Sequence, residues 1–76
     1  MLIRVNGRSK YFDHLSDFRR VGPGKYTVQH HGVEFQIEGG KHAGGSRNQW
    51  FVDTAEWTKP IYTTSVMDSL DLLEKM

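Results

Sequence analysis

Residues 25–38 constrain the fold most strongly, because apolar and polar residues alternate along this stretch on both sides of His31-Gly32. The alternating apolar residues are Tyr26, Val28, Val33, Phe35 and Ile37. A period of two places these side chains on one face of a strand, and a glycine-containing pair at the centre favours a tight turn. The stretch therefore predicts a β-hairpin with one face in the core and the other in water.

Two further strands are expected to extend this hairpin into an antiparallel meander. The segment Gln49–Asp53, which contains Trp50, predicts a third strand, and Ile61–Thr63 predicts a short strand after Pro60. Proline lacks the amide donor that a central strand needs, so the short strand is expected at an edge of the sheet.

The N-terminus predicts a second hairpin, with Leu2–Val5 as its first strand, Asn6-Gly7 as the turn and residues 8–12 as the returning strand. Both turn positions tolerate a positive φ. A two-residue turn pairs Ile3 with Lys10, so one face of this hairpin mixes apolar and charged side chains.

Residues 13–20 admit two interpretations. A turn of helix would start at Asp13, place Leu15 and Phe18 at helical spacing and stop at Gly22-Pro23. A strand leading into the turn Gly22-Pro23-Gly24 is the alternative. The spacing of the two apolar residues slightly favours the helix.

The C-terminal segment predicts a helix that begins after Ser65, with Asp68 completing a weak capping box. Its apolar stripe consists of Val66, Met67, Leu70 and Leu73. A helix of about 11 residues needs tertiary packing to be stable. The wall opposite the stripe is expected to be Val28, Phe35, Ile37 and Val52. The chain therefore predicts one α+β domain spanning 1–76: a small antiparallel sheet of three to five strands with the C-terminal helix on one face.

Composition excludes several classes of protein. The 76 residues include no cysteine, which excludes disulfides and thiolate metal sites and favours a reducing compartment, so we expect the cytoplasm of a bacterial host. No apolar run is long enough for a membrane-spanning helix. A net charge of +1 argues against a histone-like nucleic-acid binder and against an acidic DNA mimic.

The segment between Gly39 and Asn48 holds four of the eight glycines together with basic residues. It matches no phosphate-binding loop or dinucleotide fingerprint. Three interpretations stay open: a connection without a ligand, a protein contact and a nucleic-acid contact. For a protein partner, the expected contact residues are Lys41, His42, Arg47, Asn48 and Trp57. Trp57 lies in a polar segment, where it is either an exposed anchor or a cover over the end of the core, whereas Trp50 is expected in the core.

No metal, cofactor or catalytic site is expected. Adjacent residues on a strand point to opposite faces, so His30-His31 cannot both ligate one metal from a regular strand, and His14 and His42 add no helical spacing. His31 is expected to face solvent at the hairpin tip. Ser46, His42 and Asp53 are the residue types of a nucleophilic triad, but a glycine-rich segment would not hold them in register. The protein is therefore not expected to be an enzyme.

A sheet meander followed by a packed helix resembles DNA-binding domains that lay strands in the major groove, such as the arm-binding domains of tyrosine integrases and plant ethylene-response-factor domains. On the outer face of one strand, however, this chain carries Glu34, Gln36 and Glu38. The nucleic-acid alternative would instead use a basic stripe on the open side of the sheet, formed by Arg4, Arg8, Lys10, Arg19 and Arg20 with Lys41.

The chain also resembles the small proteins that phages and prophages encode. The resemblance rests on the stretch from Glu38-Gly39-Gly40 to Asn48-Gln49-Trp50-Phe51-Val52 and on the single small domain without cysteine. It implies stoichiometric binding and inhibition of a bacterial host protein or defence complex. The alternatives are a nucleic-acid-binding module and a subunit that homodimerises through an exposed strand edge.

Overall fold

A computed structural model describes residues 1–40 and 48–76. The strands are β1 (Leu2–Val5), β2 (Arg8–Tyr11), β3 (Leu15–Gly22), β4 (Lys25–His30), β5 (Val33–Gly39), β6 (Trp50–Asp53) and β7 (Ile61–Thr63), and the helix is α1 (Val66–Glu74). Strands β3 to β7 form a five-stranded antiparallel meander in chain order, and β1 pairs with β2 in a separate two-stranded sheet. The predicted α+β class, with a C-terminal helix packed on the sheet, is confirmed.

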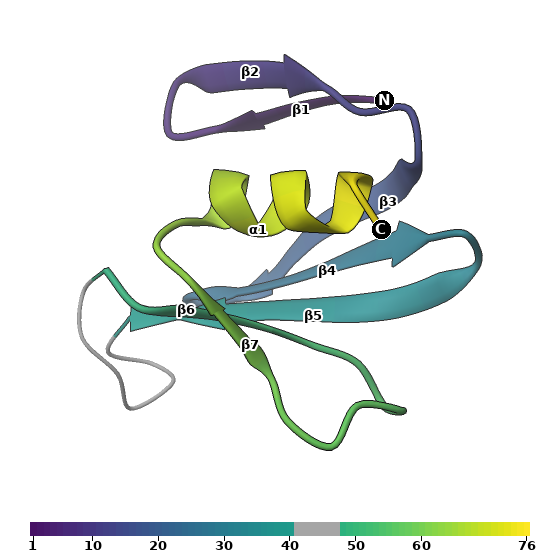
Figure 1. Cartoon of the computed structure of the whole chain (residues 1–76). Helices are drawn as coiled ribbons and strands as arrows, with labels where there is room; N and C mark the ends of the chain where they lie inside the picture. The colour runs from purple at the N-terminus through teal and green to yellow at the C-terminus, as the bar shows by residue number, and fades with distance from the viewer. Residues whose placement is uncertain (41–47) are drawn as a thin grey trace.

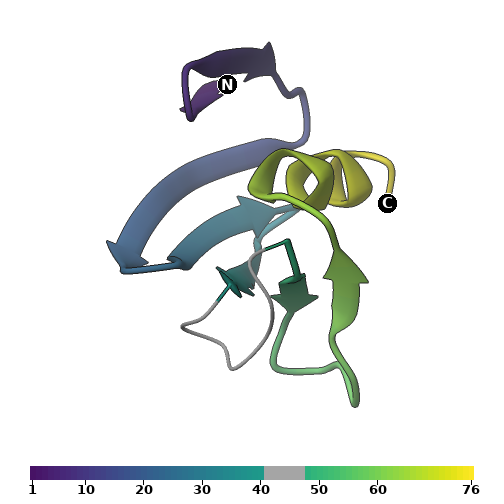
Figure 2. The ribbon, with the colours of Figure 1, turned by 90° about the vertical axis from the view of Figure 1, so that its left-hand side faces the viewer.

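The helix lies between the two sheets (Figure 1). In the view of Figure 1, the five-stranded sheet lies on one side of α1 and the β1–β2 hairpin on the other, and the view turned by 90° shows that the hairpin is displaced from the helix toward β3 (Figure 2). The buried apolar residues come from all three layers: Ile3, Val5, Phe12, Leu15, Val28, Phe35, Ile37, Val52, Val66, Leu70 and Leu73. The expected wall of Val28, Phe35, Ile37 and Val52 is therefore present, and the hairpin adds a second wall that the sequence pattern did not predict.

Both predicted two-residue turns have the backbone that their sequences favour. Asn6 and Gly7 have φ values of 52° and 78°, and His31 and Gly32 have φ values of 51° and 79°. Positive φ at both central residues matches the right-handed twist of the strands that the turn joins. The expected pairing of Ile3 with Lys10 is present. Lys10 extends past the apolar face, and its Nζ lies 2.5 Å from Oδ1 of Asp71 on α1.

The interpretation of residues 13–20 as a helical turn is wrong, because Leu15–Gly22 is strand β3. The register of β3 against β4 shifts between Ser16 and Arg19, where Asp17 has a φ of 52°. One extra residue in a strand turns the next side chain back to the original face. Leu15 and Phe18 therefore both contact the core although they are three residues apart, which is the spacing that favoured a helix.

Local capping and turn chemistry define the other boundaries. The Oγ of Ser65 accepts a hydrogen bond from the amide of Asp68 at 3.0 Å, as the predicted N-cap requires. Ser69, buried in the same helix, donates to the carbonyl of Ser65 and hydrogen bonds to Thr63 on β7. The edge position expected for Ile61–Thr63 is confirmed, since β7 pairs with β6 alone within the described residues.

Candidate functional site

The face of the five-stranded sheet that points away from α1 carries an unusual mixture of side chains. Val52 on β6 is buried against the helix, so its neighbours Phe51 and Asp53 point to the opposite face. The same alternation places Gln36 and Glu38 of β5 on that face, because Ile37 between them is buried. We call this surface the open face.

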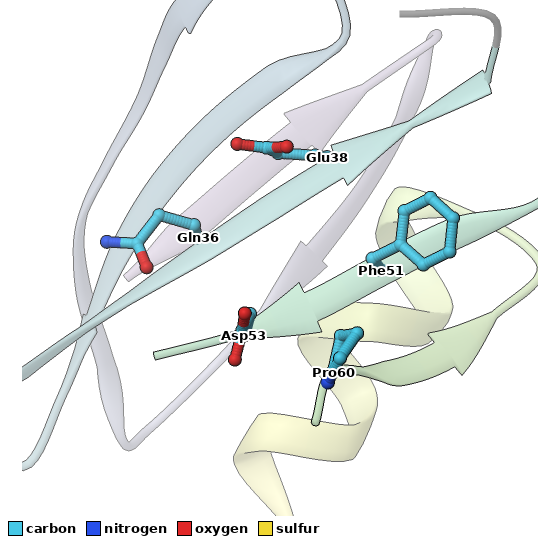
Figure 3. Close-up of a pocket in the computed structure, with 5 residues that line it drawn as sticks. All are labelled: Gln36, Glu38, Phe51, Asp53 and Pro60. Carbon is cyan, nitrogen blue, oxygen red and sulfur yellow. The ribbon is translucent and has the colours of Figure 1, made fainter. Parts of the chain in front are cut away.

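A hollow of about 330 Å³ lies on the open face. Its lining residues are Gln36, Glu38, Phe51, Asp53 and Pro60 (Figure 3). They come from β5, β6 and the residue that precedes β7. The register explains why they meet: Gln36 pairs with Asp53, and Glu38 pairs with Phe51 across the ladder. Such a volume is at the lower end for small-molecule pockets and accommodates one long side chain.

The hollow combines carboxylates with an aromatic wall. Phe51 and Tyr62 form an edge-to-face pair with ring centroids 4.9 Å apart, and Tyr62 is 63% exposed. Asp53 accepts a hydrogen bond from the amide of Thr54 at 2.8 Å. Within residues 1–40 and 48–76, the ion pairs are Lys10–Asp71 and Arg19–Asp17. Neither Glu38 nor Asp53 forms an ion pair with a residue of the described part of the chain, although Lys25 on β4 lies opposite Glu38 in the ladder. The two carboxylates can therefore attract a positively charged group.

The structure describes two of the five predicted partner-binding residues, Asn48 and Trp57. Lys41, His42 and Arg47 lie outside the described residues, as does Ser46 of the considered triad. Asn48 is exposed in a turn that precedes β6. Trp57 is half-buried, and its ring packs edge-to-face on Phe35 at 5.4 Å. Of the two alternatives for Trp57, the cover over the core is therefore the one that this geometry supports.

The described residues of the predicted basic stripe lie on two different sheets. Arg4, Arg8 and Lys10 belong to the two-stranded sheet, whereas Arg19 and Arg20 belong to β3 of the five-stranded sheet (Figure 1). Two of these five residues also form ion pairs within the protein. Lys10 pairs with Asp71, and Nε of Arg19 donates to Oδ1 of Asp17 at 2.7 Å. Lys41, the sixth member of the set, lies outside the described residues.

Three histidines meet at one end of the molecule. The ring centroid of His31 lies 4.2 Å from the ring centroid of His30 and 5.3 Å from that of His14. His31 is exposed at the hairpin tip, as predicted. His30 and His31 approach each other because His31 occupies the turn, with a positive φ, and not a regular strand position. No group of metal-ligating side chains among residues 1–40 and 48–76 is arranged to hold a metal ion.

Sequence reasoning missed the open-face site. The sequence predicts strands over Gln49–Asp53 and Ile61–Thr63, which contain Phe51 and Tyr62, without assigning these two rings to a face of the sheet. The signal was available in the alternation: once Val52 faces the core, Phe51 must face the other way. The position of the half-buried Phe51 between Glu38 and Tyr62 is therefore a property of the strand pairing, and it becomes visible only when the register is known.

No helix among the described residues is long and apolar enough to cross a membrane. Comparison of the chain with protein-family models, with curated proteins and with solved structures finds no match.

Proposed function

We propose that this protein is a non-catalytic binding module that docks a lysine- or arginine-bearing segment of a partner protein on its open face. The observation that carries the proposal is the hollow between Glu38 and Asp53, walled by Phe51 beside the exposed Tyr62. Carboxylates attract the cationic end of the partner side chain, while the rings contact its aliphatic stem. Exposed tyrosines such as Tyr62 are common anchors at interface centres.

The nature of the partner follows from the resemblance to small phage proteins. We propose that the bound segment belongs to a bacterial host protein or defence complex and that binding blocks its working surface. Lys41, His42 and Arg47 stay predicted contacts for the same partner. They follow Gly40 at the end of β5, next in the chain to the strand that supplies Glu38.

The chain offers a matched pair of tyrosines for the test. Tyr62 on the open face is 63% exposed, and Tyr11 on the β1–β2 hairpin is 65% exposed. Proteins captured from a bacterial extract would first be identified and purified, and their affinity for each variant would then be measured by calorimetry. Tyr62→Ala is expected to weaken binding by about fivefold or more, as at an interface anchor, and Tyr11→Ala to leave it unchanged.

Charge reversal tests the cationic nature of the partner segment. Glu38→Lys combined with Asp53→Lys is expected to abolish binding, and added salt is expected to weaken the wild-type complex. Equal affinity of wild type and the double variant would exclude the open face as the docking surface.

The two other classes of function give different results in the same protein preparation. A nucleic-acid-binding module would show DNA or RNA affinity that falls steeply with salt and depends on Arg19 and Arg20. A homodimer built through the edges of the five-stranded sheet, β3 and β7, would show a concentration-dependent mass in light scattering. Either result without binding of a host protein would replace the proposed function.

A further inference from the structure

The three clustered histidines come from segments that hold different parts of the fold together. His14 belongs to the connection from β2 to β3, which joins the two-stranded sheet to the five-stranded one. His30 ends β4, and His31 is in the turn to β5. The rings of His14 and His30 both approach the ring of His31. The stack therefore joins the connection to the hairpin of the larger sheet.

His30 is poorly placed to carry a charge. It is 6% exposed, and within the described part of the chain its Nε2 has no hydrogen-bond partner. Its ring also packs edge-to-face on Phe35 at 6.1 Å, and its ladder partners are Leu15 on β3 and Val33 on β5. A neutral imidazole tolerates such a site, whereas an imidazolium needs acceptors for both N–H groups.

The charged group from α1 that faces this cluster is already engaged. Oε2 of Glu74 accepts the amide hydrogen of Asp13, and Oε1 accepts that of His14, both at 2.8 Å. Burial lowers the pKa of His30 below its usual value, His31 and His14 lower this pKa further, and Glu74 raises it.

We propose that His14, His30 and His31 form a proton-sensitive latch that holds the β2–β3 connection against the β4–β5 turn. In their neutral forms the three rings pack together. Protonation of His30 places a positive charge in a buried site against the rings of the stack, and its Nε2 has no acceptor among the described residues, so the connection separates from the turn. The latch is independent of binding at the open face.

The direction of the effect follows from proton linkage. In the unfolded or locally opened state His30 binds protons with its ordinary affinity, and in the closed state it binds them less well. The opened state therefore takes up more protons as the pH falls below about 6.5, and acid favours opening. Above that range His30 is neutral in both states, and the latch is insensitive to pH.

Hydrogen exchange tests the latch at the two amides that Glu74 holds, those of Asp13 and His14. After correction for intrinsic exchange rates, their opening equilibrium in the wild type is expected to increase about tenfold between pH 7.5 and pH 5.5. His30→Phe replaces the buried imidazole with an apolar ring and is expected to remove most of this increase.

A second variant keeps the test decisive if His30→Phe disturbs the core. His14→Gln removes an exposed ring of the stack and is expected to reduce the pH dependence severalfold while the protein stays folded at pH 7.5. The same increase in wild type and His30→Phe would overturn the latch. An unchanged pH response in His14→Gln would also overturn it, because burial of His30 alone would then explain the effect.

Discussion

The hairpins β1–β2 and β4–β5 have nearly the same turn conformation but different surroundings: the first forms a separate two-stranded sheet, and the second lies within the five-stranded sheet. Their central residues have φ values of 52° and 78° in the first and 51° and 79° in the second. All four residues of β2 are exposed, whereas β4 and β5 together bury Val28, Phe35 and Ile37. The turn thus determines where the chain reverses, and the neighbours of the strands determine how much of the hairpin becomes core.

The neighbours differ in number and kind. The β4–β5 hairpin has β3 and β6 on its two edges and α1 on one face. The β1–β2 hairpin has no third strand among the described residues, and it packs on α1 through Ile3, Val5 and Phe12. An isolated two-stranded hairpin is marginally stable in water. We therefore expect β1–β2 to open locally while the five-stranded sheet stays folded.

The largest effect is expected from a core truncation in each hairpin. Ile37→Ala, at a residue with 0% exposure, should lower the global free energy of unfolding in urea by about 2–5 kcal/mol. Ile3→Ala, at 2% exposure, should mainly remove amide-exchange protection from residues 2–11. An equal global loss for both variants would show that the two hairpins unfold as one unit.

Alanine substitutions at Gly39 and Gly22 test how closely the side chain of Trp50 on β6 packs against the backbone of β5. A Cβ at Gly39 would lie 2.0 Å from Cδ2 of Trp50, so Gly39→Ala must displace the indole and should cost about 1–3 kcal/mol. Thermal unfolding would measure the loss, and tryptophan fluorescence the displacement. Gly22, at the end of β3, has no atom within 4 Å of such a Cβ, and Gly22→Ala should change stability by less than about 0.5 kcal/mol. Similar losses at both sites would contradict the close packing.

The second residues of the two hairpin turns, Gly7 and Gly32, have nearly the same backbone conformation, so alanine can be compared at both positions. Gly7 and Gly32 have φ values of +78° and +79°, and neither has an atom within 4 Å of an added Cβ. Alanine at either position should therefore cost about 1 kcal/mol of local strain. Gly32→Ala should lower global stability in urea by that amount, and Gly7→Ala should appear mainly as faster hydrogen exchange in β1 and β2. A full global loss for Gly7→Ala would refute the independence of the first hairpin.

The smallest effect is expected from the ion pair that ties β2 to α1. Lys10 and Asp71 are 52% and 31% exposed, so Asp71→Asn should cost about 0.2–1 kcal/mol, and less at high salt. A double-mutant cycle with Lys10→Met would isolate the pair. Asp17→Asn removes a comparable contact within β3 and should leave exchange in β1 and β2 unchanged. A coupling energy of zero would show that apolar packing alone holds the hairpin on the helix.

Local signals predicted most elements of the fold. Alternation identified β4 and β5, Asn6-Gly7 and His31-Gly32 identified the turns, and Ser65 identified the start of α1. The prediction of a helical turn at residues 13–20 was wrong because a bulge at Asp17 gives strand β3 the apolar spacing of a helix. A pattern of two apolar residues three positions apart cannot separate these two conformations.

The candidate site was less predictable than the fold. Phe51, Asp53 and Pro60 are separated in sequence from Gln36 and Glu38, and the pairing of β5 with β6 brings them together. The residues of the expected basic stripe are distributed for a related reason, since Arg4, Arg8 and Lys10 lie on the two-stranded sheet and Arg19 and Arg20 on the five-stranded one. The predicted contacts Lys41, His42 and Arg47 lie outside the described residues and stay predictions.

The amino-acid sequence by itself determined where most strands, the turns and the helix occur, with β3 as the exception, because alternation, positive-φ turn pairs and an N-cap act within a few residues. Tertiary structure alone decided that the first hairpin joins the same core as α1, that Phe51 and Tyr62 pair on the open face beside two carboxylates, and that three histidines meet. These features depend on strand register and on the placement of one layer against another. Both arise from contacts between residues distant in the chain, which no short sequence pattern contains.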